Sequence, residues 1–234
     1  MPLKFLLTND DGIEAPGLAA LARALESLGP WLVIAPDEHL SGCSHQATTD
    51  RGLHLRPVRG EWHALDGTPV DCTRIGLMHV APDVDWVLSG INEGGNLGAD
   101  VYHSGTVAAA REAALLGKPA IAVSQYRRRR APVDWERSSR WTRQIISLLL
   151  SRPHVAGTFW NVNLPDSAAQ PDEPEIVFCR MDPHPLPVRY RLEVGRLHYH
   201  GVYQDRLRMP GRDIDVCFSG AIAVSEISLG ERLA

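Results

Sequence analysis

Short apolar runs alternate with helical stretches up to about residue 165, and this alternation constrains the fold more than any other feature of the sequence. The apolar runs predict buried strands at residues 3–7, 31–35, 86–89, 120–124 and 158–162. Helical spacing and end signals predict helices at residues 16–28, 69–80, 107–116 and 135–150. Strand, helix and strand in succession form right-handed crossovers between parallel strands. The sequence therefore predicts an α/β fold with a doubly wound, mostly parallel sheet.

Two regions depart from this alternation. Residues 44–66 contain short alternating stretches that fit an inserted hairpin. Beyond residue 165, prolines mark a loop, residues 190–203 alternate like strands, and residues 222–224 could close a further strand. We interpret residues 1–234 as a single domain in which residues 166–234 form a β-rich C-terminal extension. This extension is too short to bury its own core, which predicts a homo-oligomer that covers apolar positions such as Leu192, Val194, Leu197 and Tyr199.

Composition and charge exclude several classes of protein. The chain has 234 residues, of which 44% are hydrophobic and 22% charged, and its net charge is -4. It is therefore not built as a binder of nucleic-acid polymers or membranes. No apolar stretch reaches the length of a membrane span and no signal peptide is recognisable, so we expect a cytoplasmic protein. Four widely spaced cysteines without a CxxC pair argue against a thiolate zinc site and a disulfide framework.

Polar segments follow the predicted strands where their carboxyl ends share one edge of the sheet, and ligands bind at such an edge. The first is Asn9-Asp10-Asp11-Gly12, and the others occupy residues 37–44, 89–106 and 124 onward. The two adjacent carboxylates converge only if the chain turns there, which Gly12 permits. Close carboxylates repel one another unless a cation or a proton lies between them. The alternative interpretation is an ordinary turn with solvated acids.

Residues 89–106 are rich in glycine and asparagine and run into an alanine-rich helix. Ser104-Gly105-Thr106 lies where that helix begins, and the free amides there form an anion site. A Cβ atom at Gly105 would crowd such a ligand. Because the segment has neither a Walker A lysine nor a GxGxxG motif at the first turn, a nicotinamide dehydrogenase is disfavoured. The alternative is a flexible surface loop.

Together these segments supply carboxylate, amide and hydroxyl oxygens beside an anion-binding helix start. Oxygen ligands favour Mg²⁺ or Mn²⁺ over zinc. A metal beside a phosphate pocket is the arrangement of metal-assisted phosphoester hydrolysis. The run Arg127 to Arg130 is interpreted as a solvated loop, with polyanion binding as the alternative. We therefore expect neutral donors at the helix start, and not these arginines, to hold the phosphate.

The motifs resemble those of the SurE family of stationary-phase survival proteins, in order, from residue 3 to about residue 165. The resemblance rests on residues 7–12 with 15–17, 35–37 with 41–42, 67–69 with 71–72, 89–92 with 94 and 96–98, 104–109, and 161–165. It implies a Rossmann-like fold and hydrolysis of nucleoside 5′- and 3′-monophosphates, with cleavage of polyphosphate from its ends in some members. It also implies homodimers or homotetramers that exchange C-terminal segments.

The resemblance also implies roles for individual residues. One divalent metal ion per subunit, Mg²⁺ or Mn²⁺, would be held by Asp10, Asp11, Ser41 and Asn92, and Asp10 or Asp11 would orient or deprotonate the attacking water. Substrate and phosphate would be bound by Asn9, Asn96, Ser104, Gly105 and Thr106. The chain departs from the usual Ser-Asn-Ser after the Ser-Gly turn, because Ser44-His45-Gln46 stands there, which makes His45 a candidate for altered selectivity.

Two other classes of function remain as alternatives. A non-catalytic nucleotide-binding regulatory module would keep the pocket without turnover, although intact Asp10, Asp11, Ser41 and Asn92 argue against it. A glycosyl transferase would use a metal and a nucleotide sugar, although no separate acceptor domain is evident.

Overall fold

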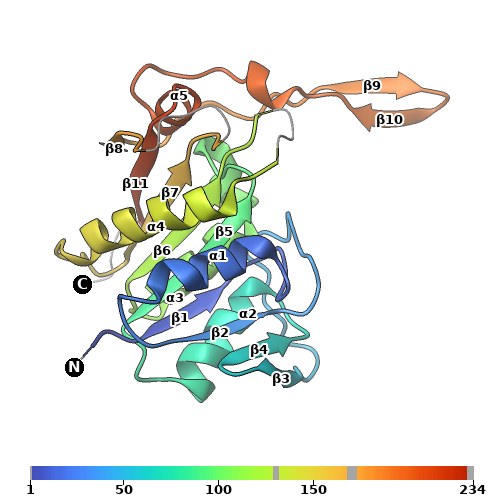
Figure 1. The fold of residues 1–234 in the computed structure, drawn as a ribbon. Helices are drawn as coiled ribbons and strands as arrows, with labels where there is room; N and C mark the ends of the chain where they lie inside the picture. The colour runs from blue at the N-terminus through green and yellow to red at the C-terminus, as the bar shows by residue number, and fades with distance from the viewer. Residues whose placement is uncertain (1, 129–131, 168–172, 231–234) are drawn as a thin grey trace.

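The computed structural model describes residues 2–128, 132–167 and 173–230 (Figure 1). The described residues form one nine-stranded sheet in the order β3-β4-β2-β1-β5-β6-β7-β11-β8. Its strands are β1 (Phe5–Thr8), β2 (Trp31–Pro36), β3 (Leu55–Arg59), β4 (Trp62–Leu65), β5 (Trp86–Glu93), β6 (Ala120–Gln125), β7 (Thr158–Leu164), β8 (Ile176–Phe178) and β11 (Ile222–Ser228). The central strands β2, β1, β5, β6 and β7 are parallel, so their carboxyl ends lie at one edge.

Helices cover both faces of this sheet. The helices are α1 (Pro16–Leu25), α2 (Pro69–Ile75) with a π-helical turn (Gly76–Val80), α3 (Gly105–Leu115), α4 (Trp135–Leu150) and α5 (Asp213–Phe218). Helices α1 and α4 pack together, as do α2 and α3, and the two pairs border separate hydrophobic cores. Strand β1 faces both cores, because Phe5 and Leu7 belong to one and Leu6 to the other. The predicted doubly wound α/β fold is confirmed.

The sequence placed most elements of the N-terminal part within a few residues. The helix predicted at 135–150 has those bounds, whereas the one predicted at 16–28 ends at Leu25. The strand predicted at 86–89 continues to Glu93, because Asn92 and Glu93 still pair with β6. The inserted hairpin is β3 and β4, and β4 joins the edge of the sheet beside β2. None of the described helices is long and apolar enough to span a membrane.

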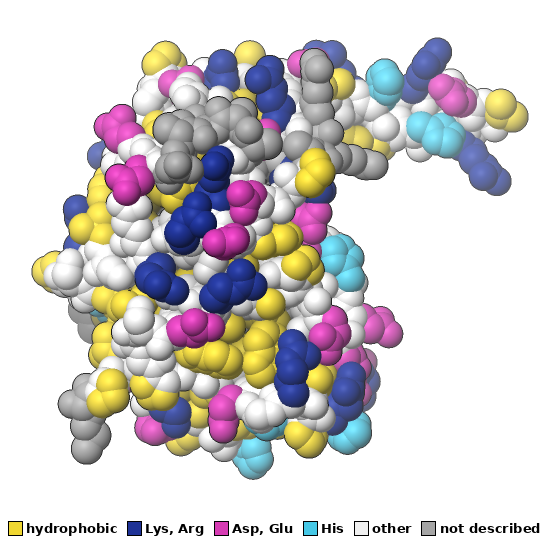
Figure 2. Space-filling model, in the orientation of Figure 1, with side chains coloured by type: hydrophobic (Ala, Val, Ile, Leu, Met, Phe, Trp, Pro, Cys, Tyr) yellow, Lys and Arg dark blue, Asp and Glu magenta, His cyan; other side chains and the backbone are white. Residues whose placement is uncertain are grey.

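The C-terminal extension divides into two parts. Strand β11 pairs antiparallel with β7 and parallel with β8, so both strands and the short helix α5 belong to the main body. The remaining hairpin, β9 (Tyr190–Glu193) and β10 (Arg196–Tyr199), forms a separate two-stranded sheet. It stands clear of the body in Figures 1 and 2. The predicted β-rich extension is therefore present as this hairpin, while the end of the chain completes the main sheet.

The start of α1 approaches β5 so closely that only glycine fits at residue 17. A Cβ atom there would lie 1.9 Å from the carbonyl oxygen of Ile91 and 3.0 Å from the Trp135 ring. This contact fixes α1 beneath the strand whose carboxyl end carries Asn92 and Glu93.

We expect Gly17→Ala to lower the free energy of unfolding by about 1–3 kcal/mol, the usual range for forcing extra atoms into a packed site. For a chain of this size that is about 2–4 °C in melting temperature for each kcal/mol. Gly52→Ala is the matched control, because a Cβ atom at this exposed glycine meets nothing within 4 Å. Differential scanning calorimetry of both variants decides, and equal melting temperatures would contradict the close approach.

Candidate active site

The two predicted aspartates lie in a turn directly after β1. Gly12 takes a φ of +98°, and the Asn9 side-chain amide donates to its carbonyl oxygen at 2.9 Å, which closes the turn. The backbone amide of Leu40 donates to the backbone oxygen of Asp10 at 2.7 Å. The turn after β1 and the loop after β2 therefore lie side by side at the carboxyl edge of the sheet.

Asp10 is a buried carboxylate, with 3% of its surface exposed. Its Oδ1 accepts a hydrogen bond from the Thr106 hydroxyl at the start of α3. Burial raises the pKa of Asp10 from 3.8 to about 6, the hydrogen bond from Thr106 opposes that rise, and the neighbouring charge of Asp11 adds to it. Among the described residues, no cationic side chain is paired with this carboxylate.

Asp11 lies beside it and is more accessible, with 11% of its side chain exposed. Its Oδ2 accepts from the backbone amide of Glu93 at 3.0 Å, and its Oδ1 lies 3.5 Å from Nδ1 of His39. Burial raises the pKa of Asp11 above its ordinary value, while the Glu93 amide and His39 oppose the rise. Strands β1 and β5 and the loop after β2 therefore converge on the aspartate pair.

The start of α3 presses against Asp10. Ser104 caps the helix, because its hydroxyl accepts from the backbone amide of Val107 at 3.1 Å. A Cβ atom at Gly105 would lie 2.8 Å from Cβ of Asp10 and 2.7 Å from Sγ of Cys43. The sequence attributed the need for glycine here to a ligand, whereas the structure gives Asp10 and Cys43 as the first neighbours. The hydroxyls of Ser104 and Thr106 both have protein partners.

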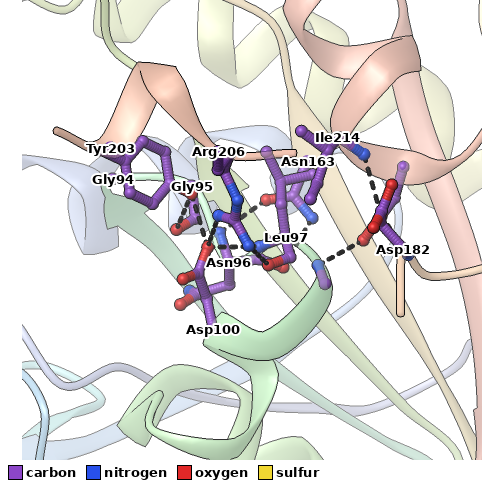
Figure 3. A network of polar contacts seen from close by, with 12 residues as sticks. Gly94, Gly95, Asn96, Leu97, Asp100, Asn163, Asp182, Tyr203, Arg206 and Ile214 are labelled. Atoms are coloured by element: carbon purple, nitrogen blue, oxygen red, sulfur yellow. Dashed lines mark hydrogen bonds and ion pairs between the residues drawn. The ribbon is translucent and has the colours of Figure 1, made fainter. Parts of the chain in front are cut away.

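The loop after β5 is held by side chains from neighbouring strands (Figure 3). The carbonyl oxygen of Asn96 accepts from the side chains of Asn161 and Asn163 at 2.9 and 3.0 Å. Its backbone amide donates to Oδ1 of Asn163 at 2.8 Å, and its own side-chain amide donates to the Ser124 hydroxyl at 2.7 Å. The asparagines of the 161–165 motif thus position Asn96.

The C-terminal portion holds the next residues of the same loop, Leu97 to Asp100 (Figure 3). Asp213 is buried, and its Oδ2 accepts from the backbone amide of Gly98 at 2.7 Å. Asp100 accepts from the Tyr203 hydroxyl at 2.5 Å and from the Arg206 guanidinium at 2.7 Å. Arg206 also donates to the carbonyl oxygen of Leu97 at 3.0 Å. None of these C-terminal contacts was predicted from the sequence.

The remaining predicted residues differ in how they are held. Ser41 is exposed in the loop that contacts Asp10, and the Asn92 side chain donates to the carbonyl oxygen of Gly94 at 2.8 Å. Oδ1 of Asn9 is buried without a hydrogen-bond partner among the described residues. Such an orphan acceptor beside the aspartates fits a site that receives a donor from substrate or water.

His45 is turned toward α3. Its Nε2 lies 2.8 Å from Oε2 of the buried Glu112, and its Nδ1 lies 3.4 Å from the Arg111 guanidinium. Glu112 also accepts from Arg74 at 2.6 Å. The histidine therefore anchors the loop of Ser41 to the helix, and its role in selectivity stays a prediction.

Arg127 and Glu93 lie beside the site and were not predicted as part of it. Arg127, in the loop after β6, forms an ion pair with Glu93, and the backbone amide of Glu93 donates to Asp11. Residue 127 lies in a loop as predicted, but its side chain is partly buried and paired with Glu93, so it is less solvated than the sequence indicated. Its position after a strand, at the fourth polar segment, was the available signal. The backbone amide of Arg128 donates to Asp166 at 3.0 Å. Arg129 and Arg130 lie outside the described residues.

The donors at this edge suit a hard divalent cation. Burial raises the pKa of both adjacent carboxyls, and a cation between them would offset that burial and the repulsion that Asp11 exerts on Asp10. In the described part of the chain, no three His, Cys, Asp or Glu side chains gather as metal ligands. Neutral oxygens must therefore complete any coordination shell, which is typical of Mg²⁺ or Mn²⁺ and not of zinc.

The raised pKa of Asp10 predicts how the stability of the metal-free protein depends on pH. Folding favours the protonated form, so the stabilisation is full below pH 3.8 and is lost as pH rises through about 6. Between pH 5 and pH 8 we expect Asp10 to lower the free energy of unfolding by about 1.5 kcal/mol. Asp10→Asn should lose this part of the pH dependence, because its amide does not ionise.

Urea unfolding in EDTA at both pH values measures the effect. Asp50→Asn, at an exposed aspartate, is the control and should behave as the unsubstituted protein does. An Asp10→Asn variant with the full pH dependence would show that the Asp10 carboxyl is not the source.

Comparison with known proteins places this geometry in a family. The family described as Survival protein SurE matches residues 5–184. A protein of Nostoc sp. is 48% identical over 225 residues, which are 96% of this chain and 99% of its own length. The 5'-nucleotidase SurE of Myxococcus xanthus is 40% identical, covering 93% of this chain and 84% of its own. The crystal structure of the SurE protein from Aquifex aeolicus superposes with a TM-score of 0.86 at 33% identity, covering 98% of this chain and 95% of that one. The chain therefore belongs to the SurE family.

Proposed function

We propose that this protein is a 5'-nucleotidase that hydrolyses nucleoside 5'-monophosphates to a nucleoside and inorganic phosphate with the help of a divalent metal ion. The observation that carries the proposal is the adjacent pair Asp10 and Asp11 at the carboxyl edge of the sheet, of which Asp10 is buried and has no cationic side chain paired with it among the described residues. Relatives named 5'-nucleotidase SurE support the choice of substrate. Nucleoside 3'-monophosphates and the ends of polyphosphate are further candidate substrates for the same site.

The metal would be held by Asp10, Asp11, Ser41 and Asn92, which come from the ends of β1 and β5 and the loop after β2. A bound divalent ion would supply positive charge to the phosphoryl oxygens. Because Asp10 is buried and Asp11 is partly exposed, we assign to Asp11 the role of orienting or deprotonating the attacking water. Water attacks phosphorus, the bond from phosphorus to the ribose oxygen breaks, and the leaving oxygen takes a proton.

The phosphate would be bound at the start of α3, where the backbone amide of Gly105 is the candidate donor. The neighbouring amides of Ser104, Thr106 and Val107 already donate to the Asp100 carbonyl oxygen, to Asp10 and to the Ser104 hydroxyl. The hydroxyls there are occupied, since Ser104 caps the helix and Thr106 binds Asp10. Helix amides and the helix dipole favour an anion without a basic side chain. Arg127 lies close by but is paired with Glu93, so part of its charge is neutralised before substrate arrives.

We expect Asp11→Asn to reduce phosphate release from AMP by at least about tenfold, because even indirect partners of metal ligands contribute that much. Adding excess Mn²⁺ or Mg²⁺ should restore part of the loss, since the variant keeps an oxygen ligand but loses a charge. The control is Asp83→Asn, at an exposed aspartate paired with Lys4. A malachite-green assay over a metal titration, with EDTA as the blank, measures both.

Three other results of these assays would contradict the proposal. Undiminished phosphate release in EDTA would remove the metal from the mechanism. Binding of AMP without release, with every metal tested, would favour the nucleotide-binding regulatory module. Sugar transfer from a nucleotide sugar would favour the glycosyl transferase.

We also propose that the protein is a homodimer or homotetramer held together through the hairpin β9–β10. Leu192 pairs with Leu197 and Tyr190 with Tyr199 across the hairpin, so all four side chains share one face. Leu192 and Leu197 are 68% and 69% exposed. An isolated two-stranded sheet is only marginally stable in water, and a second copy of the chain would cover this apolar face.

We expect Leu192→Asp to convert the oligomer to a monomer, because it places a charge in the covered face. Arg191→Asp is the matched control, since the adjacent residue points to the opposite face of the hairpin. Size-exclusion chromatography with light scattering measures the mass of each. A monomer for the unsubstituted protein, or the same shift in both variants, would contradict the proposal.

A further inference from the structure

A cleft of about 530 Å³ lies beside the aspartate pair and is not used by the proposed phosphate chemistry. It is lined by Glu93, Gly94, Gly95, Tyr126, Arg127, Tyr203 and Gln204. We propose that this cleft binds the nucleobase of the substrate, which stacks on the ring of Tyr203. The inference rests on the proposed function, because it assigns the second half of the same substrate.

The cleft is continuous with the candidate active site. Glu93 belongs to both, since its backbone amide donates to Asp11 at 3.0 Å while the residue lines the cleft. Gly94 follows directly, and its carbonyl oxygen accepts from the side chain of the predicted metal ligand Asn92 at 2.8 Å. A ligand whose phosphate lies at the aspartates therefore has the cleft as its neighbouring space.

Tyr203 presents a fixed aromatic ring to this space (Figure 3). Its hydroxyl donates to Asp100 at 2.5 Å and lies 3.4 Å from the carbonyl oxygen of Gly95. The Arg206 guanidinium lies 4.8 Å from the ring centroid and is itself tied to Asp100. The ring is only partly buried, so it is held at its hydroxyl end while it lines the cleft.

Tyr126 forms a second wall. Its ring stacks on Phe218 with centroids 4.5 Å apart, whereas the nearly parallel ring of Tyr203 lies 6.5 Å away. A Cβ atom at Gly95 would lie 3.5 Å from the Tyr203 hydroxyl and 3.6 Å from Cβ of Tyr126. Residue 95 therefore lies next to both tyrosines and lines the cleft with backbone alone.

The lining favours a planar aromatic group with polar edges. Aromatic rings bind any base through its π face, and the ion-paired Glu93 and Arg127 with Gln204 supply donors and acceptors at the rim. Stacking of this kind does not distinguish bases strongly. We therefore expect several nucleoside monophosphates to be accepted, and phosphate esters that lack a base to be bound less tightly.

Steady-state kinetics with AMP and with ribose 5-phosphate tests the assignment. We expect Tyr203→Leu to raise KM for AMP about five- to tenfold, the lower end of what base stacking contributes, with kcat little changed. KM for ribose 5-phosphate should stay within about twofold, because it has no base. Tyr203→Phe is the matched comparison, since it loses the same hydrogen bond to Asp100 but keeps the ring. Any effect of the lost hydrogen bond should fall equally on both substrates, so the ratio of the two KM values should stay as in the unsubstituted protein.

Two kinetic results would overturn the inference. One is an equal rise in KM for AMP and ribose 5-phosphate in Tyr203→Leu, and the other is a shift in the ratio of the two KM values in Tyr203→Phe as large as that in Tyr203→Leu. Ligand-observed NMR with adenosine, which has no phosphate, separates this inference from the proposed function. Saturation transfer to the adenine protons in the unsubstituted protein and Tyr203→Phe, and its loss in Tyr203→Leu, would support the cleft even if no phosphate were released. Absence of transfer in the unsubstituted protein would overturn it.

Discussion

The burial of the Asp10 carboxylate is the constraint around which the carboxyl edge of the sheet is arranged. Burying a carboxylate costs free energy unless hydrogen bonds or an opposite charge compensate for the lost contact with water. Thr106 supplies the hydrogen bond, which draws the start of α3 onto β1 across 96 residues of sequence. Gly105 is required at that contact because a side chain would strike Asp10 itself. A divalent cation bound there would supply the opposite charge that the burial of Asp10 calls for.

The loop after β5 depends on parts of the chain that carry no catalytic group. Its backbone has few strand partners beyond Glu93, and buried backbone groups must find hydrogen bonds elsewhere. Asn161 and Asn163 of β7 bind Asn96, and Asp213 of the C-terminal portion binds Gly98. The extension is therefore a support for the site as well as a projecting arm. Strand β11, the last of the described strands, lies in the main sheet between β7 and β8.

Helices, strands and motifs that are encoded within a short stretch of sequence could be predicted. Contacts between residues far apart in the sequence could not. Helix α4 follows from sixteen residues of amphipathic spacing and was placed at its bounds. Helix α5 has six residues and β8 has three, which is too short for a period to be read. The pair Asp10 and Asp11 was found because both acids stand at one strand end. The contact of Gly98 with Asp213 spans 115 residues, and that of His45 with Glu112 spans 67, so neither leaves a periodic trace in the sequence.

The structure also separates two kinds of motif that the family resemblance lists together. Asp71 of the 67–72 motif is buried, caps α2 through Thr68, and accepts from the amide and hydroxyl of Thr48. Every carboxylate oxygen of Asp71 thus has a protein donor, and its work is to fasten the loop before β3 to α2. Asp10 is different, because it is buried, only its Oδ1 has a side-chain donor among the described residues, and burial and the charge of Asp11 raise its pKa. A shared motif residue therefore identifies the family but does not reveal its role. A motif residue whose polar atoms all have partners in the chain supports the fold, whereas a buried polar atom without a partner is a candidate to bind a ligand.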